Sequence, residues 1–295
     1  MVALCPGEDP DDIAVQYDVR AGVRAPVLRT RHERIDRVIR KFSPAMMVSR
    51  VYPSARNALR VGRQHLEYDD LERRIGFSRT FRVDVDPEAD TRDLADALSE
   101  LPAVERAAPW YLCETPFDQL PTFDDEAGDE VEDLIGAEVA LGMEPGDTTL
   151  IVAVIDSGVA LRHPELERRL RPGFDAVDLA PELVSDRLDF VGDARRRDRL
   201  PEDEQGHGTC CASILCARGI GMPRGIAGAA GLLPMRALAA ARSRGAAALT
   251  AVGGIEDIDV CVKLAIDLGA RVLNLSFGTP ETALRPGDPV PHASV

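Results

Sequence analysis

In the first half of the chain, the hydrophobic positions follow a helical period in some segments and a strand period in others. Apolar residues recur at helical spacing in residues 32–42, and they alternate with polar residues in residues 81–85. The first pattern predicts a short amphipathic helix, and the second predicts a strand with one buried face. Residues 91–101 place leucine and alanine on one helical face, and residues 104–112 can return as a strand. Residues 80–114 are therefore predicted to form a small α+β unit.

The second half of the chain has the pattern of an α/β domain. Residues 149–155 are almost continuously apolar, which is typical of a strand buried on both faces. Residues 232–238 supply a second candidate strand. Residues 255–268 have helical periodicity, and residues 271–277 follow as another strand. Strands that alternate with helices predict a parallel sheet with helices on both faces.

The distribution of charge indicates a boundary between these two parts. Residues 83–135 hold 2 Arg/Lys and 17 Asp/Glu, whereas residues 1–82 hold 16 and 11 and residues 136–295 hold 17 and 22. We interpret the acidic stretch 115–135 as a solvated linker. The expected organisation is an N-terminal extension (1–79), a small α+β unit (80–114), the acidic linker (115–135) and an α/β domain (136–295).

Composition excludes several classes of function. The net charge of −15 and the aromatic content of 4% argue against a nucleic-acid-binding protein. The first twenty residues are acidic and lack the apolar run of a secretory signal, and no apolar stretch reaches membrane-spanning length. The six cysteines follow no regular disulfide framework. We therefore expect a cytoplasmic protein with reduced thiols and no membrane partner.

Three segments carry candidate chemistry. Asp156 directly follows the apolar run 149–155, at the strand end where α/β proteins place catalytic groups. An aspartate at this position could also form a turn, accept a phosphoryl group or bind a metal ion. His207 stands between two glycines ahead of a probable helix, which suits a general base, although a lone histidine often has a structural role. Residues 274–278 end a strand whose backbone can pair with an extended peptide or simply enter a turn.

These segments occur in an order that points to one protein family. The order is Asp156-Ser157-Gly158 with His163-Pro164, then Gly206-His207-Gly208-Thr209, then Gly225-Ile226-Ala227-Gly228, then Asn274-Leu275-Ser276-Phe277-Gly278. The chain thereby resembles the subtilisin-like serine proteases (subtilases) over about residues 145–280. The resemblance implies an incomplete subtilisin-like α/β fold and a serine endopeptidase activity.

The resemblance also implies roles for individual residues. Asp156 would orient and stabilise the imidazole, and His207 would act as general base and then as acid for the leaving amine. A polypeptide substrate would lie as an added strand between two edges, formed by Ser276, Phe277 and Gly278 and by Val252, Gly253 and Gly254. No metal site or other cofactor is expected, and calcium binding is left open.

Two further features concern the surroundings of this pair. Asp156 and His207 are 51 residues apart, which is long for the family and implies an insertion within residues 172–203. We interpret the arginine-rich run 195–199 inside it as an exposed loop, with a processing site as the alternative. Cys211 would share a helix face with His207, and we interpret it as a small buried hydrophobe rather than a zinc ligand with His163.

The nucleophile of the family is missing from these residues. Residues 1–295 contain no Gly-Thr-Ser motif and no counterpart of the oxyanion-binding asparagine, and Ser276 and Ser294 match neither motif. Without these groups an Asp–His pair cannot form an acyl-enzyme. The chain is then the front part of a longer protease, one half of a two-chain enzyme, or a non-catalytic relative that binds peptides or a partner.

Residues 101–111 look like the end of a subtilase prodomain, a domain that in the family assists folding and blocks the cleft with its C-terminal tail. Self-cleavage would then fall in residues 115–135, and a permanent accessory domain is the alternative. A flavodoxin-like or receiver-like domain that uses Asp156 is a further possibility for the second half, but it does not explain the motif at His207.

Overall fold

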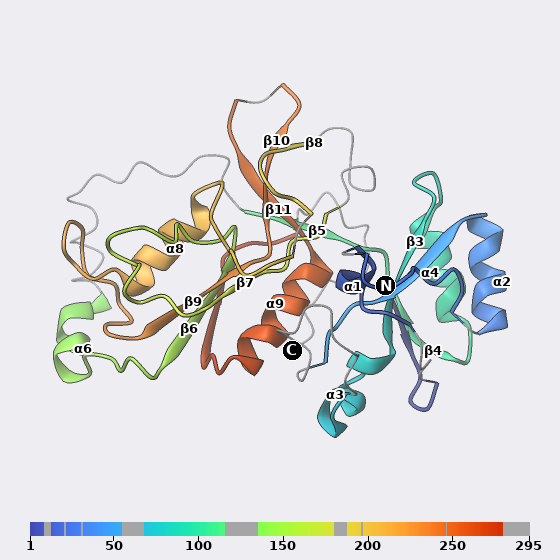
Figure 1. Ribbon diagram of the computed structural model, residues 1–295, viewed down its shortest axis with the longest axis horizontal. Coiled ribbons are helices and arrows are strands. Elements are labelled where there is room, and N and C mark those ends of the chain that lie inside the picture. The colour runs from blue at the N-terminus through green and yellow to red at the C-terminus, as the bar shows by residue number, and fades with distance from the viewer. Residues whose placement is uncertain are drawn as a thin grey trace. The chain divides into compact units, whose positions relative to one another are not determined.

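The structure is a computed structural model that divides the chain into two compact units, residues 1–110 and residues 111–295 (Figure 1). The described residues are 1–8, 13–20, 22–30, 32–54, 68–115, 135–179, 188–195, 197–245 and 247–279. The predicted linker 115–135 therefore lies outside the described residues except at its two ends.

The first unit is an antiparallel sheet with helices packed against it. Its elements are β1 (Val2–Leu4), α1 (Gln16–Arg20), α2 (Glu33–Phe42), β2 (Met46–Arg50), α3 (Asp70–Ile75), the 3-10 helix η1 (Phe77–Arg79), β3 (Thr80–Val85), α4 (Thr91–Ser99) and β4 (Val104–Ala107). The strand order is β2-β3-β1-β4, and all three pairings are antiparallel. The core is formed by the apolar faces of α2, α4 and the sheet.

The start of α4 is explained by its local sequence. The Asp90 side chain accepts hydrogen bonds from the backbone N–H groups of Arg92 and Asp93, and it thereby caps α4. The expected boundary after residue 79 is not a structural boundary, because β1 lies between β3 and β4 in one sheet. This pairing joins residues distant in sequence, so local patterns do not reveal it.

The second unit contains two four-stranded sheets. Its elements are β5 (Leu112–Glu114), α6 (Ala137–Met143), β6 (Ile151–Asp156), β7 (Phe174–Asp175), β8 (Leu188–Phe190), α8 (His207–Cys216), β9 (Gly231–Arg236), β10 (Ala239–Ser243), β11 (Thr250–Gly254), α9 (Ile255–Asp267) and β12 (Val272–Leu275). One sheet has the order β12-β6-β9-β7 and is parallel throughout. The other has the order β5-β11-β10-β8 and is antiparallel.

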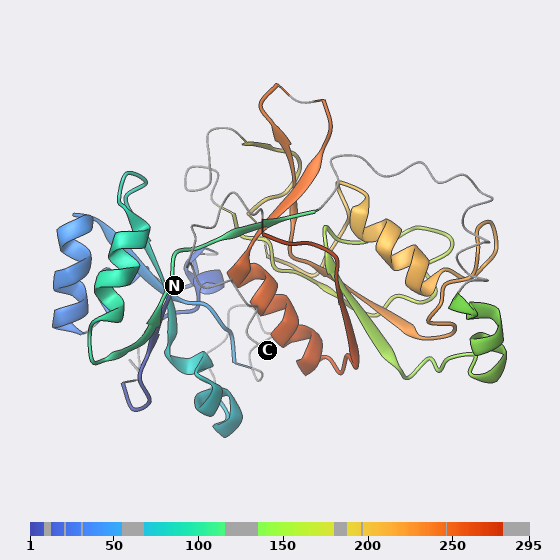
Figure 2. The ribbon, with the colours of Figure 1, turned by 180° about the vertical axis from the view of Figure 1, so that it is seen from behind.

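The parallel sheet confirms the predicted α/β architecture. The apolar run before Asp156 forms the inner strand β6, whose residues 152–156 are all buried. Helices α8 and α9 both contact β6 and β9, and Figures 1 and 2 show them on either side of these strands. Because parallel strands share one direction, Asp156 stands at the carboxyl edge of the sheet.

The segment between Asp156 and His207 is tied to the rest of the unit by buried charge. Arg197 is 5% exposed, its Nη2 lies 2.5 Å from the Asp257 Oδ1, and its Nε donates to the Ala176 carbonyl. The interpretation of residues 195–199 as a simply exposed loop is therefore wrong at Arg197. A buried carboxylate on α9 pairs with this guanidinium, and a sequence pattern does not show that pairing.

Among the residues that the structure describes, no helix combines the length and the apolar character needed to cross a bilayer.

Candidate functional site

The structure brings Asp156 and His207 together at the end of the parallel sheet. Asp156 is the last residue of β6 and is fully buried, while His207 is the first residue of α8 and is 7% exposed. The His207 Nδ1 lies 2.8 Å from the Asp156 Oδ1. Because a carboxylate accepts hydrogen bonds, Nδ1 carries the proton and donates it. The two residues therefore form a hydrogen-bonded dyad.

The two oxygens of Asp156 have different surroundings. Oδ1 also accepts a hydrogen bond from the backbone N–H of Ser157, at 2.7 Å. Oδ2 is buried and has no hydrogen-bond partner among the described residues. A buried carboxylate oxygen without a donor is costly, because it has lost its hydration without a replacement. Asp156 can therefore satisfy this oxygen by taking one more donor.

The dyad raises the basicity of the histidine. The hydrogen bond to Asp156 is the largest cause that raises the pKa of His207, to about 10, and a contact with the Cys211 thiol adds to it against the opposing effect of burial. The Cys211 Sγ lies 3.9 Å from the His207 Nδ1. Cys211 was predicted to be a small buried hydrophobic residue, but its side chain is only partly buried.

This basicity predicts how stability depends on pH. The His207 pKa is higher in the folded chain, at about 10, than its ordinary value of 6.5. The stabilisation is fully present below pH 6.5 and is lost as the pH rises toward 10. The free energy of opening of α8, measured by hydrogen exchange across this range, should therefore decrease with pH more steeply in the native chain than in Asp156→Asn. Equal slopes in the two chains would contradict this attribution.

A close backbone approach places the helix of His207 beside the loop after β6. A Cβ atom at Gly208 would lie 2.2 Å from the Gly158 carbonyl oxygen and 3.1 Å from the Asp156 Cβ. Neither neighbour is the flexible end of a side chain. Position 208 therefore requires glycine for the dyad to form at this distance.

Gly208→Ala is expected to destabilise the second unit by about 1–3 kcal/mol, because the added methyl group overpacks against backbone. The matched control is Gly142→Ala on α6, where a Cβ meets nothing within 4 Å. That control should be neutral or slightly stabilising, since alanine favours a helix. Local opening free energies from hydrogen exchange measure both, and equal effects would refute the close-approach argument.

The two predicted peptide-binding edges face the same strand. Val252, Gly253 and Gly254 end β11 and pair antiparallel with β5. On the other side, Gly278 exchanges two backbone hydrogen bonds with Glu114, at 2.9 and 3.1 Å. The space between the two predicted edges is therefore occupied by a strand of this chain itself (Figures 1 and 2).

In residues 113–115, at the end of β5 and directly after it, the side chains alternate between buried and exposed. Cys113 and Thr115 are each 3% exposed, whereas Glu114 between them is exposed. The Cys113 Sγ lies 3.5 Å from the Thr279 Oγ1, and the backbone N–H of Ala251 donates to the Thr115 Oγ1. The segment thus has the geometry of an extended peptide with alternate side chains directed into the protein.

The remaining predicted edge residues contribute less to this pairing. Ser276 accepts a hydrogen bond at Oγ from the Asn274 Nδ2, at 3.0 Å. Ser276 and Phe277 are both partly buried, and in the described part of the chain neither forms a backbone hydrogen bond to β5. The predicted strand over residues 104–112 is in fact two strands, β4 and β5, which belong to different units.

One cluster of potential metal ligands lies within this site. Asp156, His207 and Cys211 each place a ligand atom within 4.8 Å of the others. The shortest of these separations is the hydrogen bond of the dyad, so we assign the cluster to the dyad. His163, the other predicted zinc candidate, is outside the cluster and lies with its Nδ1 3.3 Å from the backbone nitrogen of Glu165.

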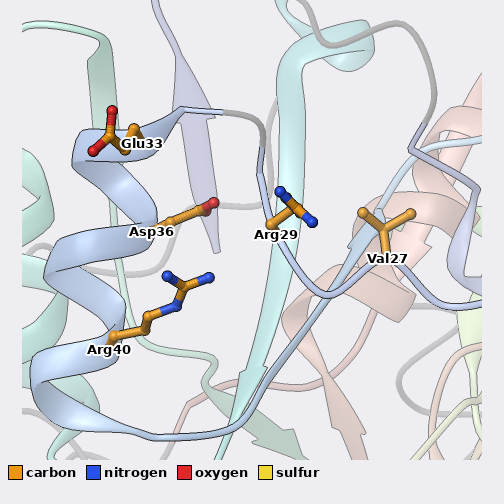
Figure 3. Close-up of a pocket in the computed structure, with 5 residues that line it drawn as sticks. All are labelled: Val27, Arg29, Glu33, Asp36 and Arg40. Atoms are coloured by element: carbon orange, nitrogen blue, oxygen red, sulfur yellow. The ribbon is translucent and has the colours of Figure 1, made fainter.

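The first unit has a pocket of its own beside α2 (Figure 3). Arg29, Asp36 and Arg40 point toward its interior, and Asp36 accepts two hydrogen bonds from Thr30. Charges of both signs line the pocket, and Asp36 already has partners. The pocket therefore shows no preference for one kind of ligand.

The second half of the chain is similar in sequence to a known protein family. Residues 147–293 match the model of the subtilase family, Peptidase_S8. The chain belongs to the subtilase family through this second half.

Individual relatives match parts of the chain. It is 30% identical over 194 residues to the thermophilic serine proteinase of Bacillus sp. strain AK1, covering 62% of this chain and 39% of that protein. It is 30% identical over 130 residues to thermitase of Thermoactinomyces vulgaris, covering 43% of this chain and 37% of that protein. The chain therefore spans about two fifths of the length of these relatives.

Among solved structures, the chain is similar to fervidolysin from Fervidobacterium pennivorans, which is described as a keratinolytic enzyme related to subtilisin. The match covers 68% of this chain and 31% of the fervidolysin chain. The TM-score is 0.43 and the sequence identity is 20%.

Proposed function

We propose that the chain supplies the Asp–His part of a subtilase-type serine endopeptidase. The observation that carries the proposal is the buried hydrogen bond of 2.8 Å between Asp156 and His207. Because Asp156 holds the Nδ1 proton, Nε2 of His207 is left to accept the proton of a serine hydroxyl. The same nitrogen then returns the proton to the leaving amine.

The serine and the oxyanion-binding asparagine come from a completing segment outside residues 1–295. The edge strand β12 supports this part of the proposal. Strands of parallel sheets are normally covered on both faces, yet Val272 is 49% exposed and Leu275 is 38% exposed. Among the described strands, β12 pairs with β6 alone. We therefore place the completing segment, from the same polypeptide or a second one, at the edge of β12 that no described strand covers.

The high basicity of His207 is consistent with an incomplete site. With a pKa of about 10 the imidazole is protonated at neutral pH, whereas a general base must be neutral. A donor to the unpartnered Oδ2 of Asp156 would weaken the attraction of this carboxylate for the imidazolium. Completion of the site is therefore expected to lower the His207 pKa toward neutrality.

The substrate is an extended polypeptide that binds as a strand. β5 supports this choice, because its backbone hydrogen bonds to β11 on one side and to Gly278 on the other. Such pairing recognises any extended backbone, and alternate side chains provide selectivity. Residues 112–115 then act as a bound, substrate-like segment that keeps other peptides out of the groove.

A serine-directed fluorophosphonate probe tests the proposal. The probe is added to two samples: residues 1–295 alone, and residues 1–295 together with a completing segment. That segment is either the polypeptide that the reading frame encodes after Val295 or the product of a neighbouring gene. We expect covalent labelling of the joined form alone, and its loss in His207→Ala. Labelling of residues 1–295 alone would contradict the proposal, because the nucleophile would then lie within them.

Failure to label any form would favour the alternative, a non-catalytic relative that binds peptides. The unpartnered β11 edge left by deleting residues 111–115 should then still bind an extended peptide, as measured by fluorescence anisotropy.

A further inference from the structure

A single carboxylate lies between the two elements that carry the dyad. Asp203 is four residues before His207, in the segment that leads into α8. Its Oδ1 accepts hydrogen bonds from the Ser157 Oγ at 2.9 Å, the Gln205 backbone N–H at 3.0 Å and the Gly206 backbone N–H at 2.8 Å. Asp203 was not predicted as a site residue, although an aspartate shortly before a helix is a recognisable capping signal.

The second oxygen of Asp203 binds the first turn of α8. The Asp203 Oδ2 accepts from the backbone N–H of Thr209 at 2.9 Å and from the Thr209 Oγ1 at 2.5 Å. The N-cap residue of α8 is Gly206, which has no side chain to cap the helix. Asp203 therefore satisfies backbone donors that the helix start leaves unpaired, and its negative charge is favourable at this end.

The hydroxyl partners of Asp203 extend the connection to the loop after β6. The Ser157 Oγ, which donates to Asp203, accepts a hydrogen bond from the Gly208 backbone N–H at 2.9 Å. The Thr209 Oγ1 likewise accepts from the Ala160 backbone N–H at 2.9 Å. Two independent links thus join the residues after Asp156 to the residues around His207.

We propose that Asp203 is a positioning residue, which holds His207 at hydrogen-bonding distance from Asp156 by binding Ser157 and the start of α8 to one carboxylate. Its contribution to catalysis rests on the proposed function, whereas its effect on the dyad does not. Asp203 touches neither side chain of the dyad, so it acts through the backbone of residues 205–209 and through Ser157.

The test is an NMR titration of the His207 imidazole in the 295-residue chain, which needs no peptidase activity. In Asp203→Ala the dyad should loosen, so the His207 pKa should lie at least about 1 below that of the native chain. Asp203→Asn removes the charge but keeps one oxygen acceptor for Ser157, Gln205 and Gly206. Its amide nitrogen cannot accept from the Thr209 backbone N–H, so the His207 pKa should decrease in Asp203→Asn, but by less than in Asp203→Ala.

Two results would overturn the proposal. An unchanged His207 pKa in Asp203→Ala would mean that the dyad is held without this carboxylate. Equal decreases in the two variants would mean that Asp203 acts by its charge and not by position. Should Asp203→Ala not fold, the double variant Ser157→Ala/Thr209→Val removes both hydroxyl links without changing any charge, and an unchanged His207 pKa there overturns the proposal equally.

The catalytically complete protein provides a separate readout. Asp203→Ala should lower kcat by about 10- to 100-fold, because small misplacements of catalytic groups have effects of this size. KM should change little, since the hydrogen bonds of Asp203 go to Ser157 and to residues 205–209 and not to the edges that bind β5. A change confined to KM would contradict a positioning role. Absence of peptidase activity in the native complete protein would refute the proposed function and leave the titration result standing.

Discussion

His207→Ala is expected to lower the rate of peptide hydrolysis by the completed protein by at least about 10⁴-fold, because members of a catalytic triad act as a unit. The imidazole is the group that takes the serine proton and returns it to the leaving amine, and alanine can do neither. Once residues 111–115 have left the two edges, binding of an extended peptide should persist in this variant, because β11 and Gly278 bind through their backbone. The loss should therefore appear in kcat, as measured by steady-state kinetics with a fluorogenic peptide.

The control for this experiment is His163→Ala. His163 lies in the same unit and interacts with the backbone of Glu165, but it is not part of the dyad. Its replacement should leave kcat within a few-fold of the native value. A His207→Ala protein that retained a rate within tenfold of the native one would show that His207 is not the general base.

Arg197→Ala is expected to destabilise the second unit by about 3–5 kcal/mol. The side chain of Arg197 is 3% exposed and that of its partner Asp257 is fully buried, so the truncation leaves a buried carboxylate without its counter-charge. Burial already raises the pKa of Asp257, and Arg197 is the main group that opposes this increase. Hydrogen exchange of the α9 amides, followed by mass spectrometry, measures the change locally.

Two further variants separate charge loss from side-chain loss. Arg242→Ala removes an exposed arginine from β10 and should change the free energy of opening by less than about 0.5 kcal/mol. The double variant Arg197→Ala/Asp257→Ala removes both charges and should be less destabilised than Arg197→Ala alone. A double variant that is much less stable than either single variant would indicate that packing and not charge dominates.

Local patterns were sufficient to predict the elements that carry the dyad. The apolar run of β6 and the glycines around His207 determine a buried strand and a helix start, and each depends on residues close in sequence. The order of these motifs then indicated that Asp156 and His207 converge. Val252–Gly254 and Gly278, which were predicted as substrate-binding edges, pair with β5 of this chain, and their binding of a substrate stays a prediction.

The features that escaped prediction depend on residues that are distant in sequence. β1 pairs with β3 and β4 across about 80 to 100 residues, and β5 pairs with β11 across about 140. Arg197 becomes buried because Asp257 lies 60 residues further along the chain. Nothing in the local pattern of either residue indicates such a partner. Backbone-to-carboxylate contacts such as those of Asp203 are likewise set by the geometry of a turn.

The most direct test of the account is the pKa of His207, measured by ¹⁵N NMR titration of the native chain and of Asp156→Asn. A hydrogen-bonded dyad predicts a pKa near 10 in the native chain and a value much closer to the ordinary 6.5 in the variant. Equal pKa values in the two chains would mean that Asp156 does not raise the basicity of His207, and this result would contradict the hydrogen-bonded dyad on which the proposed active site rests.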